Sequence, residues 1–130
     1  MTTPIDERYE RGQRAYTLIS GQSPEAALGR VAEIAPDFAR MTIEFGFGEV
    51  WSREEQLDLR SRAIATVATL AALGRQSQLA VHIANARHLG LTREELVEVM
   101  TQVAVYTGWP AAVSGLATAA EVFAKENEEQ

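Results

Sequence analysis

The sequence predicts an all-α protein of about six helices, folded as one compact domain over residues 1–130. Apolar residues recur at the three- and four-residue spacing of amphipathic helices, and no segment alternates convincingly as a half-buried strand does. Serine, threonine and proline stand where helices should begin, and glycine stands where they should end. With 46% apolar and 23% charged residues, the chain of 130 residues suits one hydrophobic core.

Three helices are expected in the first half of the chain. The first covers about residues 6–19. Ser23 is a suitable N-cap, and Pro24 a suitable first residue, for a second helix that Pro36 interrupts. The third is expected over residues 38–50, where aromatic and aliphatic residues recur at helical spacing.

Gly46 and Gly48 are expected to form a turn that leads into a longer helix. Ser52-Arg-Glu-Glu55 has the form of a capping box, in which the serine hydroxyl and the glutamate satisfy two backbone N–H groups reciprocally. This box should open a helix that runs to about Leu73, with Gly74 just after its end.

The second half of the chain predicts three more helical segments. A helix over about residues 76–89 is followed by a second capping box, Thr92-Arg-Glu-Glu95, whose helix should end at residues 106–108. The last helix is expected over about residues 111–125. The acidic tail, residues 126–130, need not be ordered.

Charge and composition exclude several classes of partner. Eighteen acidic and twelve basic residues give a formal charge of −6, and the basic residues are scattered, so no nucleic-acid partner is expected. The acidic N-terminus does not resemble a signal peptide, which favours a cytoplasmic location. Residues 99–120 form an uncharged stretch of about 22 residues, near the length of a membrane span. Gln102 and the Gly108-Trp-Pro110 break predict two buried helices there instead, and no membrane partner.

The chain contains no cysteine, which excludes disulfides, thiolate metal sites and cysteine nucleophiles. An HxxxH pair, a glycine-rich phosphate loop and a GxSxG motif are also missing from the sequence. Candidates for chemistry are therefore single polar residues in unusual places.

His82 is the first such candidate, because it falls on the apolar stripe that Leu79 and Ile83 mark on its helix. An inward imidazole can accept or deliver a proton near neutral pH. The alternative is a core histidine satisfied by a backbone carbonyl. His88 lies off this stripe and should be solvated.

Glu49 is the second candidate. It follows two glycines and precedes Val50-Trp51, so a carboxylate lies among apolar groups at a junction between helices, a setting typical of functional carboxylates. The alternative is a carboxylate that caps a helix or forms an ion pair at this junction.

Arginines and aromatic residues complete the candidates. A guanidinium of Arg60 or Arg62 facing a pocket could bind a carboxylate substrate through a bidentate contact, and the alternative is ordinary surface charge. Trp51, Tyr106 and Trp109 could contact a ligand, although such aromatic residues are more often part of the core.

Several short segments, spread over nearly the whole chain, share their order and spacing with one family of proteins. They are Arg8-Tyr-Glu-Arg-Gly12, Phe47-Gly-Glu-Val-Trp51-Ser-Arg53, Leu57-Asp-Leu-Arg60-Ser-Arg62, Leu70-Ala-Ala-Leu73, Gln78-Leu79, His82, Gly90-Leu-Thr92-Arg-Glu-Glu95 and Tyr106-Thr-Gly108-Trp-Pro110-Ala-Ala112. Together they resemble the carboxymuconolactone decarboxylase family, an all-helical group that also includes alkyl-hydroperoxide-type thiol reductases.

The resemblance favours the decarboxylase branch of that family. Arg75 and Gln78 occupy the positions of the two reductase cysteines, and Ala63 occupies the position of a glutamate that the reductases use. Disulfide reduction is therefore chemically excluded, and the protein is not expected to be a thiol peroxidase or reductase.

The resemblance implies loss of CO₂ from a carboxylated lactone in aromatic catabolism, of the type that converts 4-carboxymuconolactone to 3-oxoadipate enol-lactone. It implies that neither a metal nor an organic cofactor is needed. His82 would be the proton donor and Glu49 its orienting or proton-relay partner. The substrate-binding residues would be Arg62, Trp51, Gln78 and Tyr106.

Three departures from the decarboxylase pattern leave two other functions open. Residues 54–56 replace a Pro-Gly pair, Gln78 stands where glutamate is common, and Val113 replaces an asparagine. The first alternative is a related enzyme that acts on another cyclic carboxylate or lactone. The second is a non-catalytic small-molecule-binding or assembly protein.

The resemblance also implies a homo-oligomer, a trimer or hexamer, with sites near subunit contacts. The alanine-rich, uncharged residues 99–120 agree with this, because they offer more apolar helix surface than one small bundle readily covers.

Overall fold

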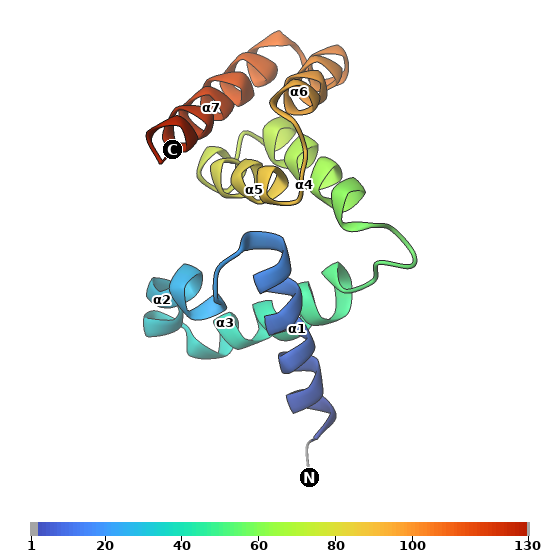
Figure 1. Ribbon diagram of the computed structural model, residues 1–130, viewed down its shortest axis with the longest axis vertical. Helices are drawn as coiled ribbons and strands as arrows, with labels where there is room; N and C mark the ends of the chain where they lie inside the picture. Colours follow the sequence, from blue (N-terminus) through green and yellow to red (C-terminus); the bar gives the residue numbers. More distant parts are fainter. Residues whose placement is uncertain (1–2, 130) are drawn as a thin grey trace. The chain divides into compact units, whose positions relative to one another are not determined.

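The structure is all-helical, as predicted, over the residues that it describes (Figure 1). It is a computed structural model that describes residues 3–129, apart from the side chain of Ile5. In chain order its elements are α1 (Pro4–Ser20), α2 (Pro24–Ile34), α3 (Pro36–Met41), the π-helix η1 (Thr42–Trp51), α4 (Leu59–Leu73), α5 (Gln76–His88), α6 (Arg93–Thr107) and α7 (Trp109–Glu128).

The chain forms two compact units, Met1–Leu59 and Arg60–Gln130. The first unit contains α1, α2, α3 and η1. The second contains α5, α6 and α7, and all of α4 beyond its first residue. The expectation of one domain over residues 1–130 stays a prediction.

A close crossing of α1 over η1 organises the first unit (Figure 1). A Cβ atom at Gly12 of α1 would collide with the backbone carbonyl of Ile43, and a Cβ atom at Gly48 of η1 would collide with the backbone carbonyl of Arg8. Each helix therefore supplies a glycine where the other helix's backbone approaches. No larger residue fits at either position without separating the helices.

The turn expected at Gly46 and Gly48 is absent, and that prediction was wrong. Both glycines lie inside η1, whose hydrogen bonds step back five residues, as from the Ser52 N–H to the Phe47 carbonyl at 3.2 Å. Gly48 serves helix packing rather than a turn. Glycine has the same sequence signature in both roles, so the pattern alone favoured the commoner one.

The capping box predicted at Ser52–Glu55 does not open a helix either. The Ser52 hydroxyl donates to the Gly48 carbonyl at 2.6 Å, which caps the end of η1. Because this hydroxyl is bound to a carbonyl of η1, it does not cap a new helix. The chain continues through turns, and α4 begins only at Leu59.

The core of the first unit combines aromatic and aliphatic side chains. The Tyr16 and Phe47 rings meet edge to face with centroids 4.8 Å apart. The rings of Phe47 and Trp51 stack with their centroids 6.1 Å apart. Ile19 of α1 and Ile43 of η1 are buried as well.

The second unit is built on α7, which packs against both α5 and α6 (Figure 1). A Cβ atom at Gly115 would lie 2.6 Å from Met100 Sδ and 3.6 Å from Ala71 Cβ, so a larger residue at this position of α7 would have to displace the Met100 side chain. The fully buried side chains of the second unit include Val67, Leu79, Ile83, Leu91, Leu96 and Met100.

Most of the predicted helix ends are confirmed. The Thr92 box forms in both directions, with 3.0 Å from the Glu95 N–H to Thr92 Oγ1 and 2.9 Å from the Thr92 N–H to Glu95 Oε1. Ser23 caps α2 through the Ala26 N–H at 3.2 Å. Gly74 and Gly90 follow α4 and α5 with φ of 72° and 95°, as helix-terminating glycines do.

The helix α7 continues through Glu128, beyond its predicted end near Lys125. Arg87 and Arg93 each form an ion pair of 3.0 Å with Glu126, which holds this last turn against the bundle. The hydrogen bond from Arg87 is the main cause that lowers the pKa of Glu126. Of the tail, residue 130 lies outside the described residues.

The uncharged stretch over residues 99–120 is divided between α6 and α7 at Gly108, as expected. Within the described residues, no helix combines the length and the apolar character that crossing a bilayer requires.

We expect Gly12→Ala to lower the free energy of unfolding by about 2 kcal/mol or more, because the added methyl forces α1 away from η1. Urea unfolding followed by circular dichroism measures this change. Gly46→Ala is the control, since nothing lies within 4 Å of its Cβ position. An equally small effect at both glycines would contradict the close crossing.

Candidate functional site

Glu49, near the end of η1, is held by two arginines of α1. Arg8 Nε lies 3.0 Å from Glu49 Oε1, and Arg11 Nη2 lies 2.9 Å from the same oxygen. Arg11 Nε also donates to the Gly48 carbonyl at 2.7 Å. The side chain of Glu49 is 40% exposed, so this ion-pair cluster faces solvent. Of the two readings of Glu49, the structure shows the ion pair at the helix junction.

The two arginines reach one carboxylate for a simple geometric reason. Arg8 and Arg11 are three residues apart on α1, so they lie on one face of that helix. The glycine crossing brings this face against η1. Both arginines stand in the Arg8–Gly12 segment that contributes to the resemblance, but neither was assigned a role, and their helical spacing is the signal that could have done so.

Trp51 is half-buried and stacks with Phe47, with an angle of 12° between the two rings. The core reading of this tryptophan is therefore observed in part. Part of the Trp51 side chain stays exposed, and this residue follows Glu49 by two positions at the end of η1.

His82 lies in α5 and is half-buried, between the fully buried Leu79 and Ile83. Burial lowers the pKa of His82 from its ordinary value of 6.5, because a charged imidazole loses solvation. The neutral ring is therefore favoured at neutral pH. His88, at the end of the same helix, is exposed as predicted.

Arg60 and Arg62 have different environments on α4. Arg60 Nη2 donates to both oxygens of Glu95, at 2.8 and 2.9 Å, so the surface-charge reading holds for Arg60. The Thr92 backbone N–H is the largest cause that lowers the pKa of Glu95, followed by the Arg60 hydrogen bond. Arg62 is half-buried.

Tyr106 and Trp109 are not core residues in the described part of the chain. Their exposed fractions are 79% and 69%, so the core reading of these two aromatic residues was wrong. They flank Gly108, where α6 ends and α7 begins, and that tight connection leaves their rings at the surface. Gln78, one turn before His82 on α5, is also exposed.

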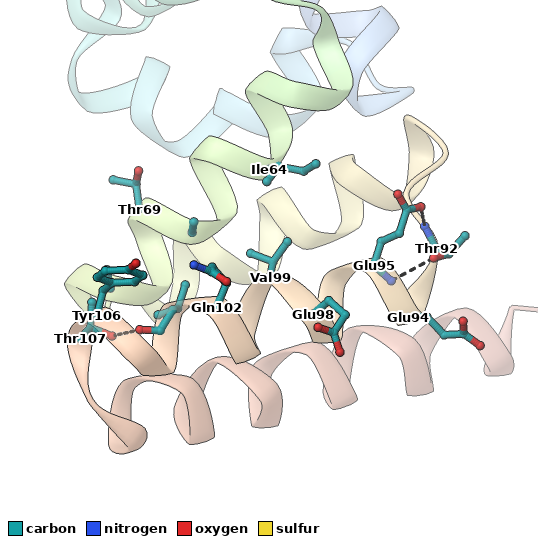
Figure 2. Close-up of a pocket in the computed structure, with 13 residues that line it drawn as sticks. Ile64, Thr69, Thr92, Glu94, Glu95, Glu98, Val99, Gln102, Tyr106 and Thr107 are labelled. Atoms are coloured by element: carbon teal, nitrogen blue, oxygen red, sulfur yellow. Dashed lines mark hydrogen bonds between the residues drawn. The ribbon is translucent and has the colours of Figure 1, made fainter.

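A groove of about 880 Å³ runs between α4 and α6 (Figure 2). Ile64 and Ala68 of α4 and Val99 and Val103 of α6 supply apolar lining. Figure 2 shows that Tyr106 and Thr107 mark one end of this groove, whereas Thr92, Glu94 and Glu95 mark the other.

The charge of this groove does not suit an anionic substrate. Glu94, Glu95 and Glu98 line it, and no lysine, arginine or histidine is among its lining residues. Of the residues predicted to bind substrate, it contains Tyr106 alone. The groove and the predicted proton-transfer residues are therefore different features of the molecule.

The remaining predicted residues divide between the two units. Glu49 and Trp51 belong to the first unit, and Arg62, Gln78 and His82 belong to the second. Within the second unit, Gln78 and His82 share one helix and Arg62 lies on another. Among residues 3–129, no group of three or more histidine, aspartate or glutamate side chains could hold a metal ion.

The described part of the chain is all-helical, and the sequence contains no cysteine. The candidates for catalysis are therefore histidine, glutamate and arginine side chains. The sequence model of the carboxymuconolactone decarboxylase family matches residues 36–121, and the chain belongs to this family. The match spans both units and contains Glu49, Arg62 and His82.

Two relatives extend this comparison. The "4-carboxymuconolactone decarboxylase" of Acinetobacter baylyi is 33% identical over 119 residues, which cover 91% of this chain and 88% of that protein. An "uncharacterized 15.0 kDa protein in nqo9-nqo10 intergenic region" of Paracoccus denitrificans is 29% identical over 99 residues, covering 75% of this chain and 73% of that one.

We expect His82 to titrate below pH 6.5, because burial penalises its charged form. The imidazole resonances of the two histidines, followed by NMR from pH 4 to 9, measure this directly, and His82→Asn assigns the signal. A midpoint for His82 above 6.5 would contradict the effect of burial.

Proposed function

We propose that the protein is a cofactor-independent carboxy-lyase of aromatic catabolism that converts 4-carboxymuconolactone to 3-oxoadipate enol-lactone. The similarity to the Acinetobacter baylyi decarboxylase over 91% of the chain carries this proposal. The absence of cysteine supports it further, because thiol-dependent peroxide reduction requires groups that this chain lacks.

The reaction itself can proceed without a metal or an organic cofactor. When the bond between the ring carbon and its carboxylate breaks, the electron pair delocalises through the ring alkene onto the lactone carbonyl oxygen. CO₂ leaves, and a proton is then added to the carbon beside that carbonyl. The protein must hold the carboxylate, stabilise the oxyanion and supply the proton.

Three residues of this chain suit these tasks. The guanidinium of Arg62 would anchor the carboxylate that is lost, through paired hydrogen bonds. His82 would deliver the proton to carbon, and its lowered pKa makes the imidazolium a stronger acid than an exposed histidine. Glu49 would orient His82 or relay its proton, and Trp51, Gln78 and Tyr106 would contact the substrate.

We expect His82→Asn to lower kcat by about 100-fold or more, which is the usual contribution of a positioned general acid. The assay follows ultraviolet absorbance and CO₂ release from enzymatically prepared 4-carboxymuconolactone with metal-free protein. His88→Asn is the matched control on the same helix and should leave turnover unchanged. Unchanged turnover in His82→Asn would contradict the assignment.

The pH profile of the wild-type enzyme gives a second readout in the same assay. A proton donor must be protonated, so kcat should fall as pH rises through the lowered pKa of His82. A rate that instead rises over this range would make His82 a base.

A second candidate function is a related reaction on another cyclic carboxylate or lactone. Its support is the set of departures from the family pattern. Residues 54–56 lie in the irregular segment before α4, and Gln78 and Val113 are exposed on α5 and α7. Well-folded protein that leaves 4-carboxymuconolactone unchanged would favour this candidate over the first.

We also propose that the protein assembles into a homo-oligomer, a trimer or hexamer. Large apolar side chains remain exposed in both units, among them Ile34, Phe38, Phe45, Tyr106 and Trp109. Analytical ultracentrifugation should show one species of three or six chains at micromolar concentration. A monomer at that concentration would overturn this proposal.

A further inference from the structure

The groove between α4 and α6 lies wholly within the second unit, and only Tyr106, at one end, has a role in the proposed reaction. Its volume is about 880 Å³. Along α6 it extends from Glu94 to Tyr106, which is about 18 Å at the rise of an α-helix (Figure 2). This length equals about three turns of a second helix, so the groove suits an elongated occupant.

The walls of the groove carry small or branched apolar side chains. Ala68 and Ala72 lie one turn apart on α4, and Val99 and Val103 lie one turn apart on α6. Ala72 is exposed and Val99 is half-buried, so part of this apolar surface meets solvent. Small side chains let a third helix lie close to both walls, because the distance between packed helices depends on the side chains at the contact. Amphipathic helices bind in apolar grooves of this kind.

The rim that α6 contributes to the groove is acidic. Glu94 and Glu98 line it, are exposed, and form no ion pair within the described residues. They lie one turn apart, where like charges repel each other and destabilise a helix. The positive end of the helix dipole stabilises Glu94 in the first turn, but its effect does not extend to Glu98. Folding of α6 therefore does not account for this pair of carboxylates.

Neighbouring cations do not compensate the two carboxylates either. The basic residues of α4 and α6 are Arg60, Arg62 and Arg93, and none of them lines the groove. Arg60 binds the third glutamate of the rim, Glu95, at 2.8 Å. Arg93 binds Glu126 of α7 at 3.0 Å. The missing positive charge has to come from the occupant of the groove.

We propose that the groove between α4 and α6 binds a basic amphipathic helix of a partner protein. Apolar residues on one face of that helix cover the alanines of α4 and the valines of α6. Lysine or arginine side chains beside this face pair with Glu94 and Glu98. A second copy of this chain is opposed by its formal charge of −6, which repels an acidic rim. This interaction does not depend on the reaction proposed above.

The probe is a synthetic, fluorescein-labelled peptide of about 14 residues, which spans about 21 Å as a helix. Leucines occupy one face of this helix, and lysines flank them. A second peptide has glutamate in place of every lysine. A third has the composition of the first, with its leucines distributed around the helix. Fluorescence anisotropy with the full-length protein gives the Kd of each peptide.

We expect the lysine peptide to bind the wild-type protein with a micromolar Kd. Its affinity should fall as salt is raised, because the ion pairs at the rim are exposed. The glutamate peptide should bind about tenfold more weakly or not at all, because the rim repels it. The third peptide should also bind more weakly, because it has no continuous apolar face.

Variants of the second unit locate the binding site. Glu94→Gln and Glu98→Gln should each weaken binding about two- to fivefold, as loss of one exposed ion pair does. Glu121→Gln, at an exposed position of α7 outside the groove, should have no effect. Ala72→Lys should weaken binding about tenfold, because it places a cationic side chain in the groove. Ala65→Lys is the matched control, since Ala65 is exposed on the same helix but does not line the groove.

Three results would overturn the proposal: no binding of the lysine peptide, equal binding of the lysine and glutamate peptides, or equal effects of Ala72→Lys and Ala65→Lys. Circular dichroism verifies that both lysine variants are folded. Sedimentation of the same two variants tests the competing occupant. If Ala72→Lys dissociates an oligomer that Ala65→Lys leaves intact, a second copy of the chain covers the groove and no partner helix binds there.

Discussion

The contact of two bare backbones, where Gly12 meets Ile43 and Gly48 meets Arg8, determines how the first unit presents its charges. Side chains normally keep helix axes 8 to 10 Å apart. At this crossing the two glycines contribute no side chain, so the guanidinium groups of α1 reach the last turn of η1 directly. The ion pairs with Glu49 are a result of this packing rather than its cause, since such exposed pairs contribute little stability by themselves.

The Arg8–Arg11–Glu49 cluster and the groove between α4 and α6 differ in the charge of their side chains. Two arginines meet one carboxylate in the Arg8–Arg11–Glu49 cluster, whereas three glutamates line the groove of about 880 Å³ in the second unit. Volume alone would direct attention to the groove. The glutamates of this groove do not suit an anionic ligand, whereas Arg8 and Arg11, which the fold brings together, already bind a carboxylate.

The sequence predicted helices well where local chemistry determines them, as at the Thr92–Glu95 box and at Ser23. It failed between Gly46 and Glu55, because there the tertiary contact with α1 decides. Gly48 is needed for packing and Ser52 closes η1, and neither demand is visible without knowing which helix lies alongside. For the same reason the sequence identified Glu49 but not its arginines, which come from a segment 38 to 41 residues away.

The π-helix makes the position of Glu49 depend on how η1 is wound as well as on which residues it contains. Each residue of an α-helix advances the side chains by about 100° around the axis, whereas the five-residue hydrogen bonds of a π-helix give a wider turn with a smaller advance. Rewinding η1 as an ordinary α-helix of the same length would therefore rotate Glu49 relative to Arg8 and Arg11 without altering any of the three side chains. Keeping these residues is not sufficient to keep the arrangement, because the winding of the helix that carries Glu49 has to be kept as well.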